Sequence, residues 1–97
     1  MKLLWLPTAM EDRVAIFDYI EKDSPEAAII VDDRILNAIE YLIRYPGIGR
    51  PGRRKGTKEL VIRRTSYVAA YRVKADTVEI VRIVHTSKRW PSLKTKR

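Results

Sequence analysis

The hydrophobic pattern of the chain changes its period once, at a segment rich in proline and glycine. Before residue 46, apolar side chains recur at helical spacing, and after residue 56 they follow the shorter period of strands. The segment between them, Pro46 to Gly52, holds two prolines and three glycines, so it can be neither a helix nor a central strand. We therefore expect a helical first part and a β-rich second part.

The first part predicts a short strand and a helical hairpin. The apolar run over residues 2–6 ends at a proline, which is typical of a strand. Thr8 to Glu11 matches a capping box and predicts a helix to about residue 21. Ser24-Pro25 predicts the start of a second helix, which should end near residue 44. The residues expected to face the core are Met10, Val14, Phe17 and Ile20 in the first helix, and Val31, Ile35, Ala38 or Ile39, and Leu42 in the second.

The second part predicts three antiparallel strands joined as a meander. Residues 57–65, 67–74 and 77–85 have the alternation or the β-branched content of strands, and Ala75-Asp76 is a two-residue turn. The whole chain, residues 1–97, is thus expected to form one α+β domain of two layers, in the order β-α-α-β-β-β. Its basic end, residues 91–97, is expected to fray.

Cysteine and histidine usage excludes several kinds of site. The chain has no cysteine and one histidine, so disulfide frameworks, Cys/His zinc sites and His-pair mechanisms are excluded. We expect no metal and no cofactor. Only four consecutive apolar residues, Leu3 to Leu6, precede Pro7, and no apolar run approaches the ~20 residues that span a membrane. These features predict a cytoplasmic protein that does not contact a membrane.

Positive charge is concentrated in the second part. Residues 1–43 hold four bases and nine acids, a net charge of −5, whereas residues 44–97 hold sixteen bases and three acids, a net charge of +13. A buried sheet face does not accept unpaired arginine. Strand alternation therefore predicts that Arg63, Arg72 and Arg82 share the face opposite the helices. They are either simply solvated there or form part of a protein-binding face.

The ordered set of segments resembles a known family. It comprises the loop from Tyr45 to Gly52, the strands Glu59–Ile62 and Tyr67–Arg72, and the ending Ile80–His85 followed by Trp90-Pro91. Over essentially the whole chain, these segments are similar to the RelE/ParE superfamily of type II toxins. The resemblance implies a growth-inhibiting toxin whose partner is an acidic antitoxin that wraps around it. A basic toxin suits such a partner, because opposite charges speed their association.

The superfamily divides into two activities. RelE-like members are ribosome-dependent endonucleases that cut mRNA without a metal, using several basic residues and often a C-terminal tyrosine. ParE-like members poison DNA gyrase. This chain has Val61 and Val68 where the nucleases carry bases, and it has no tyrosine beyond Trp90. These departures favour the ParE and plasmid-stabilisation branch, a gyrase poison rather than an enzyme. A RelE-like endonuclease and a non-toxic basic binding module are the alternatives.

The resemblance and the charge pattern together give the candidate site residues. Those expected to bind the target or the antitoxin are Arg50, Arg63, Arg72, Arg82, His85, Arg89 and Trp90. Under the nuclease alternative, catalysis would fall to Arg63, His85, Lys88 and Arg89; otherwise no catalytic residue is assigned. The expected partners are a cognate acidic antitoxin and DNA gyrase, or alternatively the ribosome and its mRNA. A toxin dimer and a hetero-oligomer with the antitoxin are the two alternatives for assembly.

Overall fold

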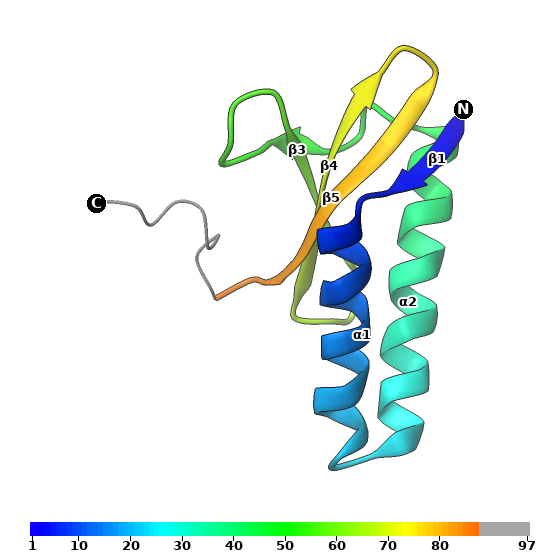
Figure 1. Cartoon of the computed structure of the whole chain (residues 1–97), viewed down its shortest axis with the longest axis vertical. Coiled ribbons are helices and arrows are strands. Elements are labelled where there is room, and N and C mark those ends of the chain that lie inside the picture. Colours follow the sequence, from blue (N-terminus) through cyan, green and yellow to red (C-terminus); the bar gives the residue numbers. More distant parts are fainter. Residues whose placement is uncertain (88–97) are drawn as a thin grey trace.

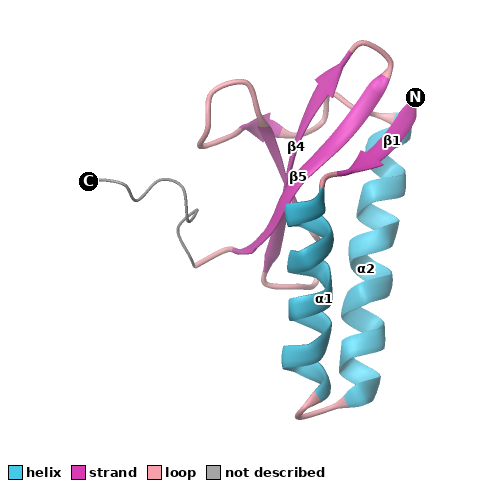
Figure 2. Cartoon of the chain, in the orientation of Figure 1, coloured by secondary structure: helices cyan, strands magenta, loops and turns pink. Residues whose placement is uncertain are grey.

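A sheet and a helical hairpin form the two layers of the fold. The computed structural model describes residues 1–87 and is shown in Figures 1 and 2. Its elements are β1 (Lys2–Trp5), α1 (Pro7–Glu21), α2 (Pro25–Arg44), β2 (Arg50–Pro51), β3 (Lys58–Val61), β4 (Tyr67–Lys74) and β5 (Thr77–His85). The α+β architecture and the order of the expected elements are confirmed, and the tail over residues 91–97 lies outside the described residues.

The sheet has the strand order β1-β5-β4-β3-β2. β1 runs parallel to β5 and extends the meander on one side, with Lys2 opposite Thr77 and Trp5 opposite Ile80. On the other side, the two-residue strand β2 pairs with the start of β3. The sequence analysis did not predict β2. The strand is only two residues long, and its proline and the neighbouring glycines are typical of a loop.

The second helix forms as its sequence predicts. The Ser24 hydroxyl accepts a hydrogen bond from the backbone N–H of Ala27 at 3.1 Å, and Pro25 occupies the first turn. Ile35, Ile39 and Leu42 are buried against the sheet. All of these features depend on local sequence, namely a cap and one apolar stripe.

The first helix differs from the prediction at its start and in its inward face. Leu6 is the N-cap residue and makes no side-chain cap, so the predicted capping box is wrong. The Thr8 hydroxyl instead donates to the carbonyl oxygen of Val81 at 3.0 Å. Met10 and Val14 are exposed, whereas Ala9 is fully buried. α1 takes this orientation because it lies along β5. Backbone C=O and N–H groups of that strand need hydrogen-bond partners, and polar side chains of α1 supply them.

β1 ends at Trp5 and leaves the second half of β5 as an open edge, which α1 then covers. The Leu6 N–H donates to the carbonyl oxygen of Ile80 at 3.0 Å. The Asp12 carboxylate accepts from the backbone N–H of Ile83 at 2.9 Å. A polar residue of α1 thus faces the sheet, because an unpaired backbone N–H at this edge would be costly.

A β-bulge lies between β4 and β5. Ala70 is opposite Arg82, but the next residue, Tyr71, is opposite Ile80, so Val81 is the extra residue. Ile80 and Ile83 consequently both join the core under the helices. Simple alternation along β5, as used in the sequence analysis, is therefore wrong beyond the bulge.

Tyr71 connects the core to the proline- and glycine-rich loop. Its ring is fully buried, and its hydroxyl donates to the carbonyl oxygen of Pro46 at 2.7 Å and accepts from the N–H of Gly49 at 2.9 Å. A Cβ atom on Gly49 would lie 2.5 Å from that hydroxyl oxygen, so the position has no room for a side chain. Burial raises the pKa of Tyr71, despite the Gly49 hydrogen bond. The loop is thereby fixed against the sheet, and β2 follows it.

Candidate functional site

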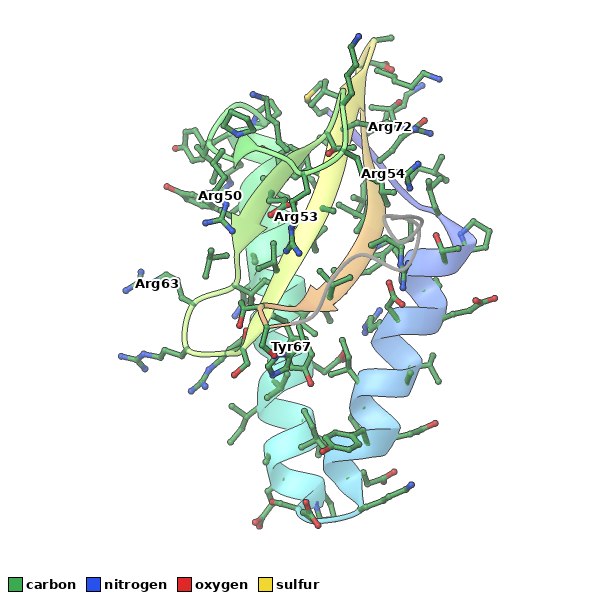
Figure 3. The ribbon with its side chains drawn as sticks, turned by 90° about the vertical axis from the view of Figure 1, so that its left-hand side faces the viewer. Arg50, Arg53, Arg54, Arg63, Tyr67 and Arg72 are labelled. Atoms are coloured by element: carbon green, nitrogen blue, oxygen red, sulfur yellow. The ribbon has the colours of Figure 1, made fainter. Side chains whose placement is uncertain are left out.

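Arginines gather on the face of the sheet that α2 does not cover. Figure 3 shows Arg50, Arg53, Arg54 and Arg72 over this face, coming from β2, the loop after it, and β4. We call these four residues the arginine surface. Two of its members, Arg53 and Arg54, were not among the predicted site residues.

Glu59 is the buried anion beneath the arginine surface. It is 3% exposed, and its carboxylate accepts from the Arg53 backbone N–H at 3.0 Å and the Arg53 Nε at 3.1 Å. The Nη2 of Arg50 lies 3.4 Å from its other oxygen. Burial alone would raise the pKa of Glu59, but the hydrogen bonds from Arg53 and Arg50 outweigh it and leave the pKa below its usual value. An ionised Glu59 therefore holds the 50–53 segment in place.

Arg72 is paired within the sheet. It lies directly opposite Glu79 on β5, and its Nε donates to a carboxylate oxygen of that residue. The Arg72 side chain keeps 41% of its surface exposed, against 14% for Glu79. Arg72 can thus offer its remaining N–H groups to a partner while its charge is largely balanced.

Arg82 lies opposite Ala70, on the same sheet face as Arg72, but α1 binds it, so it is not part of the arginine surface. Its Nε and Nη2 donate to the two oxygens of Asp12 at 2.7 and 2.8 Å. This pairing raises the pKa of Arg82 above its usual value, although burial acts in the opposite direction. The bulge and the position of α1 give Arg82 a partner that strand alternation could not reveal.

Arg63 also lies apart from the arginine surface. It follows the end of β3, is exposed, and in Figure 3 points outward beside the turn that leads to β4. The predicted set of three arginines therefore occupies three different environments. Of the other predicted residues, Arg50 lies on the arginine surface, His85 lies at the end of β5, and Lys88, Arg89 and Trp90 lie outside the described residues.

His85 borders a groove of about 930 Å³ between α1, the end of β5 and the β3–β4 turn, which we call the Tyr67–His85 groove. The Tyr67 and His85 rings meet edge to face, with their centres 5.4 Å apart. The Ser87 N–H donates to His85 Nδ1 at 3.1 Å, and the Ser87 hydroxyl oxygen lies 2.7 Å from the same nitrogen. Burial and the nearby Tyr19 raise the pKa of Tyr67. The raised pKa favours the protonated form of Tyr67, which can donate a hydrogen bond.

This groove offers hydrogen bonding, apolar contact and the charge of Arg64, which lines it. Arg82 lines it too, but Asp12 neutralises that charge. Val61 and Val68, the two positions where the resembling nucleases carry bases, face each other directly across β3 and β4. Within residues 1–87, no group of three or more His, Asp or Glu side chains could hold a metal ion. No helix in that same part of the chain is long and apolar enough to cross a bilayer.

Sequence reasoning missed Glu59 and Arg53 as a unit. One signal was available: Glu59 is one of three acids in the strongly basic second part, and the other two stand close together at Asp76 and Glu79. An isolated acid in a predicted strand, six residues after Arg53 of an arginine-rich loop, is a candidate partner for that loop. Nothing comparable indicated which arginine would bind it.

Comparison with known proteins gives a consistent family. The family described as "ParE toxin of type II toxin-antitoxin system, parDE" matches residues 3–90. The "Putative toxin Y4kP" of Sinorhizobium fredii is 41% identical over 92 residues, which is 95% of each chain. The "Toxin RelE2" of Caulobacter vibrioides is 37% identical over 87 residues, covering 90% of this chain and 97% of that one.

Two solved structures share the fold. A chain of the "Chromosomal ParDE TA system from P. aeruginosa" superposes with a TM-score of 0.78 at 32% identity, over 88% of this chain and 95% of that chain. A chain of the toxin-antitoxin complex RelBE2 from Mycobacterium tuberculosis gives a TM-score of 0.55 at 28% identity, over 87% and 88% of the two chains.

Proposed function

The chain belongs to the ParE toxin family of type II toxin–antitoxin systems, and on that basis we propose that it poisons DNA gyrase in the cytoplasm and is held inactive by a cognate antitoxin. The choice of gyrase rests mainly on one observation. Val61 and Val68 lie directly opposite each other in the sheet. They stand at two positions where the resembling mRNA-cutting toxins carry basic residues.

Metal-free RNA cleavage needs several preorganised cations around the reacting phosphate. Two arginines line the described part of the Tyr67–His85 groove, and one of them, Arg82, is already bound by both oxygens of Asp12, which leaves Arg64. The pKa of Tyr67 is raised, which disfavours its anionic form. A groove of this kind suits binding more than phosphoryl chemistry, which supports a toxin that acts by capturing a protein target.

The antitoxin partner is supported by the comparisons and by charge. Both solved relatives were described as toxin–antitoxin systems or complexes. The arginine surface presents four arginines, of which Arg50 and Arg53 bind the buried Glu59 and Arg72 binds Glu79. An acidic antitoxin would be steered toward this surface before forming specific contacts.

An mRNA endonuclease is the second candidate, favoured by the similarity to the relative named RelE2 and by the pairing of Tyr67 with His85. Of its four candidate catalytic residues, Arg63 and His85 lie in the described part of the chain, and they line different grooves.

A supercoiling assay separates the two. Purified toxin is added to gyrase, ATP and relaxed plasmid, and the toxin–antitoxin complex serves as the matched control. We expect toxin alone to block supercoiling at micromolar concentration and the complex to leave it intact. Unimpaired supercoiling, together with codon-positioned cuts in primer extension on translated mRNA, would reject the gyrase proposal in favour of the endonuclease.

A further inference from the structure

The strand β1 forms an open edge of the sheet. It pairs with β5 on one side and, within residues 1–87, with no strand on the other (Figure 1). Natural proteins usually protect such an edge with charges, prolines or bulges, because an open edge accepts further strands. Of these protections, the four residues of β1 hold only the charge of Lys2.

The side chains of this edge are apolar and exposed. Leu3 is 39% and Leu4 is 46% exposed, and Met1, just before the strand, is exposed as well. Leu3 stands beside Val78 of the core and therefore points to the helical side of the sheet. Leu4 stands beside Glu79 and points to the other side. Both sides of the edge thus offer apolar surface to a partner.

The outward backbone groups of the edge belong to Leu3 and Trp5. The N–H of Lys2 donates to the carbonyl oxygen of Asp76 at 2.7 Å, and that of Leu6 donates to β5 at 3.0 Å. In a parallel pair of strands, every second residue directs both its N–H and its C=O toward the neighbour. The N–H and C=O of Leu3 and Trp5 therefore point away from β5.

These outward groups fit a second copy of the same strand. If two β1 strands run antiparallel with Leu4 opposite the partner's Leu4, then Leu3 stands opposite the partner's Trp5. Each such pair exchanges two hydrogen bonds, so every outward N–H and C=O of both strands is satisfied. Leu4 then occupies a non-hydrogen-bonded position on the two-fold axis, where opposite side chains lie closest. The contact is self-complementary, as two-fold dimer interfaces are.

Charge favours this edge for contact between two copies. The chain carries a net charge of +8, so two copies repel each other wherever their basic segments meet. The basic segment over residues 50–58 lies with β2 at the opposite edge of the sheet. Near β1, Lys2 pairs with Asp76 and Arg72 pairs with Glu79. An acidic partner therefore finds little charge to bind at β1, whereas a second copy meets little repulsion.

We propose that the chain forms a two-fold dimer through β1, which joins the sheets of two copies into one continuous sheet. The two-fold axis of such an antiparallel strand pair stands perpendicular to the sheet. Both helical hairpins then lie on one side, and both arginine surfaces lie on the other. The dimer would present two arginine surfaces to one partner at once, which increases avidity without a new contact. This inference does not depend on gyrase being the target.

The expected affinity is modest, because β1 is only four residues long. A contact of this size falls in the class of weak, transient interfaces, so we expect a dissociation constant on the order of 10 μM. Sedimentation velocity of the purified chain over about 1–200 μM covers this range. The sedimentation coefficient should rise with concentration from the monomer value toward that of a dimer.

Leu4→Lys tests the position on the two-fold axis. It places two like charges directly opposite each other in the dimer and should weaken association at least roughly tenfold. Ile29→Lys is the matched control, because it also replaces an exposed apolar side chain by lysine, but on α2. It should leave the dissociation constant unchanged. In dilute solution both variants should melt within about 3 °C of the wild-type chain, since both positions are exposed.

Leu3→Pro tests the backbone pairing. It removes an outward N–H that β5 does not use, and proline is tolerated on an edge strand. The dimer loses two hydrogen bonds, so association should weaken roughly tenfold. In the wild-type chain, protection of the Leu3 and Trp5 amides from hydrogen exchange should increase with protein concentration. If Leu3→Pro impairs folding, this exchange measurement decides the point without it.

Three results would overturn the inference. One is a wild-type chain that stays monomeric at about 200 μM. Another is a dimer that Leu4→Lys weakens no more than Ile29→Lys does. The third is a dimer that dissociates when salt is raised to about 0.5 M, which would point to contact between the acidic hairpin and the basic half instead. Gyrase assays on Leu4→Lys keep the two proposals apart, because the chain can dimerise whether or not it inhibits gyrase.

Discussion

Removing the Asp12 carboxylate would break the attachment of α1 to the open half of β5. Asp12 accepts three hydrogen bonds, from Arg82 Nε at 2.7 Å, from Arg82 Nη2 at 2.8 Å and from the Ile83 backbone N–H at 2.9 Å. The side chains of Arg82 and Asp12 are only 22% and 16% exposed. Asp12→Ala would therefore leave a guanidinium and a backbone N–H with little water to replace the lost acceptor.

The expected cost follows from this burial. Removing one partner of a buried ion pair costs about 3–5 kcal/mol, and we take the lower end because both side chains keep some contact with water. Asp12→Ala should thus lower the free energy of unfolding by about 3 kcal/mol, which corresponds to a drop of roughly 12–24 °C in the melting temperature of a domain of this size.

Urea denaturation of the wild-type chain, Asp12→Ala, Arg82→Ala and the double variant gives the required cycle. Asp18→Ala, which removes an exposed carboxylate from the same helix, is the control and should change stability by less than about 0.5 kcal/mol. The coupling between Asp12 and Arg82 should exceed about 1 kcal/mol. If Asp12→Ala were no more destabilising than Asp18→Ala, the assignment of Asp12 as the link between helix and strand would be refuted.

Three further predictions concern the loop before β3, and all are measured by chemical denaturation. Glu59→Gln should cost about 2 kcal/mol at neutral pH, since it weakens charge-assisted hydrogen bonds from Arg53. The pKa of folded Glu59 is lowered, so this advantage of the wild-type chain is present above the usual glutamate pKa and should vanish as the pH falls through the folded pKa; an undiminished difference near pH 3 would contradict it. Tyr71→Phe should cost about 1–2 kcal/mol, because it leaves the Gly49 N–H and the Pro46 carbonyl unpaired. Gly49→Ala should cost at least as much, because its Cβ would lie 2.5 Å from the Tyr71 hydroxyl oxygen, and stability equal to wild type would show that the loop is not held there.

The parts of the fold that depend on local sequence were predictable. The Ser24 cap and the apolar stripe of α2 lie within a single element, and the structure reproduces both. The orientation of α1 was not predictable in this way. Its inward face is set by Asp12 and Thr8, which satisfy backbone groups of β5 some seventy residues away in the sequence.

In the candidate site, too, local sequence predicted some features, and contacts between distant elements determined the others. Strand alternation placed Arg72 correctly, since it acts over a few residues, but it could not show that Asp12 of α1 binds Arg82. The partners of the arginines depend on contacts between elements, and charge counting cannot assign them. The buried position of Glu59 is the clearest case, because only the folded sheet brings it beneath Arg53.

The most direct test of the central claim is a DNA cleavage assay with purified toxin, gyrase and supercoiled plasmid. A toxin that poisons gyrase should trap the enzyme on cut DNA, so linear plasmid should accumulate with toxin concentration and disappear when antitoxin is added first. The contradicting result is a toxin that arrests growth when expressed, leaves gyrase cleavage at its basal level and cuts mRNA on translating ribosomes.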